Sequence, residues 1–252
     1  MEGAVENYEK FEDLHVSPLH GKHLSEEVRP LIASVVNMDD IDSFTSQKMR
    51  EIIAEGVDVE FARYNSNHEK NNLVFLDNGK EHLVIISGID DNSKFSKRFY
   101  NCTGVIGVGI DSLTGENVSF LSHQDPNYFL KSETDGDKFM HKISDKFTEL
   151  KQRSVPQSVD IVIFGGRSVL DQPEDNADYH QVIDLLADEV VQTFGFQPVV
   201  FQPKSDKRGA TAVYLDTQAR RMYLLQREDE HRSGSAFNAQ DLSDKEQEWG
   251  TV

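Results

Sequence analysis

The chain has 252 residues, of which 37% are hydrophobic and 28% charged, enough to form one large domain or two small ones. A formal net charge of −18 argues against nucleic-acid binding, because phosphate backbones require a basic face. No apolar stretch is long enough to span a bilayer and no signal pattern opens the chain, so we expect a cytoplasmic protein. The single cysteine excludes an internal disulfide and suits a reducing compartment.

The N-terminal region, residues 1–70, is expected to be a helical extension that packs on the core. Its apolar spacing predicts helices over 25–36 and 43–55. The pattern then changes to strands, which are predicted at 57–64, 73–76 and 82–86, the last two joined by a tight Asn-Gly turn.

Residues 88–98 are polar and are predicted to form a loop. The loop carries a small basic group in an acidic chain, formed by Lys94, Lys97 and Arg98. Two interpretations remain open for this group: ordinary solvated loop residues, or a site that steers an acidic segment of a substrate.

The central part of the chain predicts a β-hairpin that places a thiol and an imidazole together. Two apolar runs, 105–110 and 118–121, are joined by a turn-rich segment. Cys102 precedes the first run and His123 follows the second, so antiparallel pairing brings both to one edge of the sheet. A neighbouring imidazole can deprotonate a thiol and make it a nucleophile. The alternative is a buried, unreactive cysteine and a histidine with no catalytic role.

The C-terminal half predicts two helices on a sheet. The helix over 136–152 carries apolar residues at helical spacing, and the wholly apolar strand over 159–164 is expected to be covered on both faces. The remaining elements are expected at 176–194 (helix), 197–201, 211–216 and 221–226 (strands), followed by a flexible acidic tail over 229–252. This order predicts an α+β fold with a mixed β-sheet or two-layer β-sandwich core and helices packed on its outside.

Several common site motifs are missing from the sequence. Gly104, Gly107 and Gly109 lie within a predicted strand, not at a strand-to-helix turn, so they indicate close backbone approach and not a dinucleotide site. The chain has no G-x-S-x-G, no H-E-x-x-H and no second cysteine, so we expect no metal and no cofactor.

Three segments together resemble a known superfamily. They are a cysteine that opens a strand (Cys102-Thr103-Gly104), a histidine that closes the next (Leu121-Ser122-His123), and a later apolar strand that ends in Gly165-Gly166. This arrangement resembles the thiol deamidases, which include bacterial chemoreceptor glutamine deamidases, the catalytic domains of cytotoxic necrotizing factors and protein N-terminal asparagine amidohydrolases. The likeness covers roughly residues 80–226, within an expected deamidase-like domain over 71–228.

The resemblance implies that Cys102 attacks a glutamine or asparagine carboxamide of a protein substrate while His123 transfers protons. Ser96 stands six positions before Cys102, where the family has a threonine that completes the site. Backbone around Asn101 and Thr103 would bind the oxyanion, and Gly165 and Gly166 would let the chain approach the site closely. The chain departs from the family in the residues before the cysteine, where Tyr100-Asn101 replaces Gly-Ser, and in a longer turn.

Other functions stay open at this level. The same pair of residues also suits a transglutaminase-like reaction or hydrolysis of small amides, and an inactive protein-binding domain is a third interpretation. The composition fits a housekeeping cytosolic enzyme and equally a bacterial effector or toxin delivered into a host cytosol. Oligomeric state is not readable from this sequence.

Overall fold

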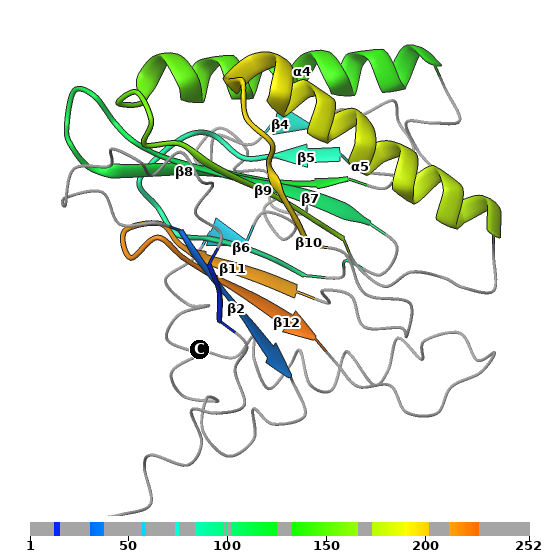
Figure 1. Ribbon diagram of the computed structural model, residues 1–252, viewed down its shortest axis with the longest axis horizontal. Helices are drawn as coiled ribbons and strands as arrows, with labels where there is room; N and C mark the ends of the chain where they lie inside the picture. Colours follow the sequence, from blue (N-terminus) through cyan, green and yellow to red (C-terminus); the bar gives the residue numbers. More distant parts are fainter. Residues whose placement is uncertain are drawn as a thin grey trace, which may run out of the picture.

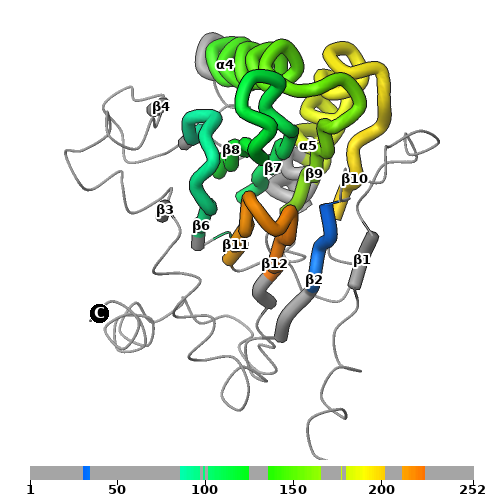
Figure 2. Tube along the Cα trace, turned by 90° about the vertical axis from the view of Figure 1, so that its left-hand side faces the viewer, coloured from blue at the N-terminus to red at the C-terminus, as the bar shows by residue number. Residues whose placement is uncertain are grey.

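Two mixed β-sheets face each other, and two long helices cover the outer face of one of them (Figure 1). The computed structural model describes residues 13–15, 31–37, 57–58, 74–75, 84–97, 99, 102–124, 133–165, 173–201 and 212–226. Within these ranges the layers follow the order sheet, sheet, helices (Figure 2). The α+β prediction is confirmed, and its core takes the form of a two-layer sandwich.

Sheet B lies in the middle layer and is built around the predicted hairpin. The central strands β7 and β8 pair antiparallel from Thr103↔Gln124 to Ile110↔Asn117. β9 lies along the other side of β7. In spatial order the described strands are β10 (Val199–Phe201), β9 (Asp160–Gly165), β7 (Thr103–Ile110), β8 (Asn117–Gln124), β5 (Val84–Ile86) and β4 (Val74–Phe75).

Sheet A forms the outer layer, away from the helices. Its strands β11 (Ala212–Asp216) and β12 (Arg221–Gln226), which the sequence predicts at 211–216 and 221–226, pair antiparallel. β12 continues the sheet by parallel pairing with β2 (Ile32–Asn37). In spatial order the described strands are β1 (Asp13–His15), β2 (Ile32–Asn37), β12 (Arg221–Gln226), β11 (Ala212–Asp216), β6 (Lys94–Lys97) and β3 (Val57–Asp58).

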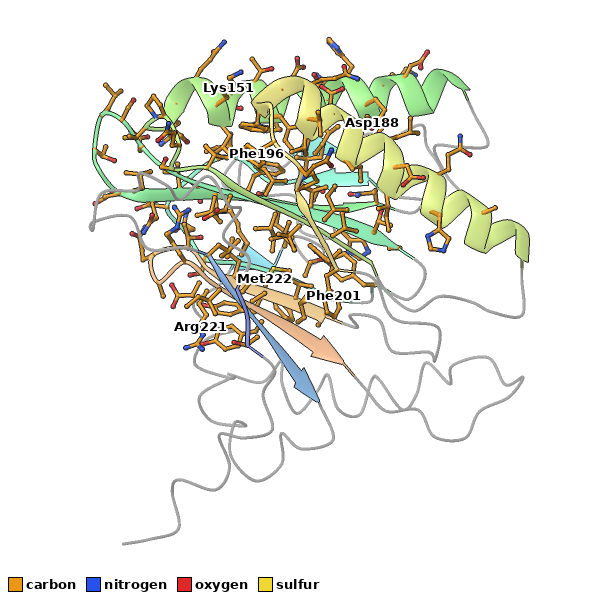
Figure 3. All side chains as sticks on the ribbon, viewed as in Figure 1. Lys151, Asp188, Phe196, Phe201, Arg221 and Met222 are labelled. Carbon is orange, nitrogen blue, oxygen red and sulfur yellow. The ribbon has the colours of Figure 1, made fainter. Side chains whose placement is uncertain are left out.

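The two helices, α4 (Glu133–Arg153) and α5 (Pro173–Phe194), pack on sheet B through one apolar face each. Their inward residues and the outer face of sheet B form the helix-side core. Lys151 and Asp188 lie on the opposite faces, directed away from the sheet (Figure 3). The helix-side core comprises Ile86, Ile89, Val105, Val118, Phe120, Phe139, Ile143, Phe147, Leu150, Val159, Ile161, Ile163, Val182, Ile183, Leu186 and Val190.

A second apolar layer, the inter-sheet core, fills the space between the two sheets. Strand alternation divides neighbouring residues between layers, so Val105 faces the helices and Ile106 faces sheet A. Likewise Met222 points between the sheets while Arg221 lies on the outer face of sheet A (Figure 3). The inter-sheet core comprises Leu31, Ala33, Phe99, Ile106, Val108, Leu121, Val162, Phe164, Val213, Leu215, Met222 and Leu224.

Two predictions of secondary structure are wrong. The helix expected over 25–36 is contradicted where Ile32–Asn37 forms strand β2, whose β-branched residues suit its place between β1 and β12. The polar loop expected over 88–98 contains strand β6. Hydrophobic alternation does not reveal this strand, because the residues that face inward, Lys94 and Ser96, are polar. The helix expected over 43–55 and the tail over 229–252 lie outside the described residues.

The polar residue Lys94 is buried, with 1% of its surface exposed, so it is not a solvated loop residue. Its ammonium pairs with the carboxylate of Asp90 and donates to the backbone oxygen of Asn92 at 2.8 Å. Burial lowers the pKa of Lys94 below its usual 10.5, even though Asp90 acts in the opposite direction. Lys94 therefore anchors the turn before β6 instead of steering a substrate.

An ion pair joins the sheets at the end where the β7–β8 hairpin turns. Arg220, in the β11–β12 turn, pairs with Asp160 at the start of β9 and donates to the backbone oxygen of Ser158 at 2.9 Å. Asp160 also accepts from the backbone N–H of Leu31 at 3.1 Å. Both charged side chains are at most 8% exposed, so each depends on the other to offset its desolvation.

We expect Arg220→Met to lower the free energy of unfolding by about 3–5 kcal/mol, because it leaves a carboxylate buried without its partner. Asp160→Asn should have a similar effect for the same reason. The double variant should lose less than the sum of the two, which urea denaturation of all four proteins would measure. Losses that add within about 0.5 kcal/mol would contradict a coupled pair.

We also expect Lys94 to make the free energy of unfolding depend on pH in the alkaline range. Between its folded-state pKa and 10.5, the unfolded chain holds a proton that the folded chain lacks, so stability rises with pH in this window. Lys94→Met should flatten that rise, while Lys142→Met, on the exposed face of α4, should leave it unchanged. Denaturant titrations at a series of alkaline pH values test this. If stability still rises with pH in Lys94→Met, another group causes the rise.

Candidate functional site

Cys102 and His123 lie on the same face of sheet B. His123 of β8 pairs directly with Gly104 of β7, and Cys102 is two residues before Gly104 along the same chain. Extending the strand alternation by one residue places Cys102 diagonally from His123 on the same face. Cys102 packs against the inter-sheet core, as this alternation requires.

The two side chains differ in exposure. His123 is buried, with 7% of its surface exposed, whereas Cys102 is only partly buried. The pairing register places His123 near the end of β8 and Cys102 directly before β7, both in the middle of sheet B. Contact between the thiol and the imidazole stays a prediction.

Ser96 contacts the imidazole from the opposite sheet. It lies on β6 of sheet A, fully buried, and its Oγ is hydrogen-bonded to Nδ1 of His123 at 2.9 Å. The bond crosses the apolar layer between the sheets. Because Nδ1 bonds to Ser96, a proton exchanged with a thiol or a substrate would have to pass through the other ring nitrogen, Nε2.

Phe99 covers one face of the imidazole, and no sequence motif marks it as a site residue. The two ring centroids are 3.9 Å apart and the ring planes are inclined by only 16°, which is a parallel stack. Phe99 lies in the segment that leaves β6 in sheet A and enters β7 in sheet B. The sequence offers one sign of Phe99: it lies midway between two predicted site residues, three positions after Ser96 and three before Cys102.

The remaining predicted residues are only partly brought together. Thr103 lies one position after Cys102, but its side chain points to the helix side of sheet B, where its Oγ1 is buried without a hydrogen bond. Gly165 is buried and pairs with Thr103 across β7 and β9, close to the predicted site. Asn101 and Gly166 lie outside the described residues. Thr103 can therefore contribute only its backbone to the face that carries His123.

Comparison with known proteins adds no assignment. No protein-family model matches the chain, and neither a curated protein nor a solved structure was found to match it. Within the described ranges, no three His, Cys, Asp or Glu side chains cluster closely enough to hold a metal ion. In the same ranges, neither helix is long and apolar enough to cross a membrane.

We expect Ser96→Ala to change the ring ¹⁵N signals of His123, because Nδ1 loses its partner, and Ser96→Thr to preserve them. Ser119→Ala is a matched control. Ser119 is a buried serine on β8, the strand that carries His123, and its Oγ is hydrogen-bonded to Thr217 at 2.7 Å. Each alanine variant should lose about 1–3 kcal/mol of stability, whereas only Ser96→Ala should move the histidine signals. Equal effects of both variants on His123 would contradict the direct contact.

Proposed function

We propose that the protein is a cysteine-dependent hydrolase that converts a side-chain carboxamide, glutamine or asparagine in a protein substrate, to the carboxylate. The observation that carries this proposal is the hydrogen bond between Ser96 and His123, on the face of sheet B that Cys102 packs against. It supplies the three groups that the activation of a thiol needs, namely a nucleophile, a base and a group that orients the base.

The polarity of this arrangement supports catalysis over a purely structural role. A hydroxyl and an imidazole are buried beside the apolar side chains of the inter-sheet core. Burying polar groups of this kind lowers stability compared with well-packed apolar residues, even when they bond to each other. A cysteine with only a packing role would not require a hydrogen-bonded serine and histidine nearby.

In the first half of the proposed reaction, Nδ1–H of His123 donates to Ser96 Oγ and Nε2 takes the proton of Cys102. The thiolate attacks the carboxamide carbon and forms a C–S bond, and the carbonyl becomes an oxyanion. His123 then returns the proton to the amide nitrogen, the C–N bond breaks, and ammonia leaves.

In the second half, water replaces ammonia. His123 takes a proton from water as the oxygen attacks the thioester carbon, and the C–S bond breaks. The proton returns to the sulfur, so the thiol and the neutral imidazole are restored. The sum is one carboxamide and one water converted to a carboxylate and an ammonium ion, and these residues are sufficient for every proton transfer.

Partner and location are part of the same proposal. A protein substrate in the cytosol, either of the producing cell or of a host, fits a single thiol that must stay reduced to act. The related reactions differ in the group that accepts the acyl intermediate: water in deamidation, an amine in transglutamination.

We expect Cys102 to react with iodoacetamide at neutral pH, and His123→Ala to slow this by about tenfold or more, since an adjacent base contributes on the order of 10²–10⁴ to such steps. Ser96→Ala should slow it less. The measurement is the alkylation rate against pH, read by intact-protein mass. An inert Cys102 that ignores His123→Ala would leave a non-catalytic binding domain.

Catalysis itself is tested by incubating proteins of a cell lysate with the wild type and with Cys102→Ala. Deamidated glutamine or asparagine residues and released ammonia are expected with the wild type alone. Release that requires an added amine would reassign the enzyme as a transglutaminase, and release from free glutamine or asparagine alone would reassign it as a small-amide hydrolase.

A further inference from the structure

We propose that Phe99 is a positioning residue that fixes the plane of the His123 imidazole, so that Nε2 is held in the direction of Cys102. This inference rests on the proposed function, because it assigns Phe99 a part in the same thiol activation. It adds a residue that contacts the base but takes no part in the chemistry.

The stack restrains a rotation that the hydrogen bond to Ser96 does not by itself prevent. With Nδ1 bound to Ser96 Oγ, the imidazole can still tilt about the line through that bond. Phe99 lies parallel to the ring at a centroid distance of 3.9 Å, which is about van der Waals contact, so a tilt in its direction brings the rings into collision. Ser96 therefore fixes the ring nitrogen, and Phe99 fixes the ring plane.

Phe99 is itself held in place by Phe164. The two rings meet edge to face at 5.0 Å, and both are fully buried. Phe164 lies over Gly104, where an added Cβ would come within 2.3 Å of its ring. Gly104 is the residue that pairs with His123 on one side and with Phe164 on the other, so its missing side chain makes room for the aromatic cluster.

The same segment carries both restraints and the nucleophile. Ser96 lies on β6, Phe99 lies between β6 and β7, and Cys102 directly precedes β7. A shift of these residues would move the two restraints and the thiol relative to the imidazole of His123 on β8. Such coupling matters because a misplacement of about 1 Å in a reacting group can lower a rate by 10²-fold.

A matched control separates positioning from ordinary core packing. Phe120 lies on β8 like His123, is also fully buried, and packs against Phe147 on the helix side of the strand. Phe120→Leu removes an aromatic ring from the same strand without touching the imidazole. Phe99→Leu removes the ring that stacks on it.

The experiment compares wild type, Phe99→Leu, Phe120→Leu and His123→Ala by denaturant midpoint and by the rate of Cys102 alkylation against pH. Both leucine variants are expected to lower the midpoint, while only Phe99→Leu lowers the histidine-dependent part of the alkylation rate, by about tenfold. If Phe99→Leu does not fold, Phe99→Met, which fills the space with a flexible chain, takes its place.

The outcomes distinguish the two proposals. If His123→Ala slows alkylation and Phe99→Leu matches Phe120→Leu across the pH range, the positioning role is wrong and the thiol–imidazole pair stands. If His123→Ala has no effect on alkylation, the pair itself fails, and the role of Phe99 fails with it. NMR gives an independent test of the stack in solution. The ring protons of His123 should be shifted upfield by Phe99, and this shift should change in Phe99→Leu but not in Phe120→Leu.

Discussion

One hydrogen bond between the two sheets determines how the candidate site is built. Ser96 on β6 and His123 on β8 meet across the layer between the sheets, and the two residues are 0% and 7% exposed. A buried polar group without its partner is unfavourable by about 1–3 kcal/mol, so each holds the other in place. Because each belongs to a different sheet, their bond also fixes where β6 lies over β8.

Polar contacts at the other end of the sandwich complete this alignment. Arg220 and Asp160 pair across the sheets where the β7–β8 hairpin turns, and Ser119 and Thr217 bond there as well. Apolar layers tolerate sliding because they have no directional contacts, whereas hydrogen bonds have preferred geometry. Polar ties at both ends therefore set the relation of the sheets, and the position of the base relative to the thiol follows from it.

The errors of the sequence-based prediction have a common cause. The sequence predicts a loop where β6 forms, because the inward residues of this strand, Lys94 and Ser96, are polar, and hydrophobic alternation cannot reveal a strand whose buried face bonds to Asp90 and His123. It predicts a helix where β2 forms, and β2 is held on one side by β1 and on the other by β12, which lies almost two hundred positions away. In both places a tertiary contact, and not local preference, selects the structure.

The sequence by itself determined the β7–β8 hairpin and the two helices with their apolar faces, and it placed Cys102 directly before the hairpin and His123 near its closing end, because these features depend on contacts between near neighbours in the chain. It also placed a hydroxyl at position 96. Only the tertiary structure decided that Ser96 reaches Nδ1, that Phe99 covers the ring and that the Thr103 side chain turns away. Those outcomes depend on how two sheets face each other, and no local pattern encodes that relation.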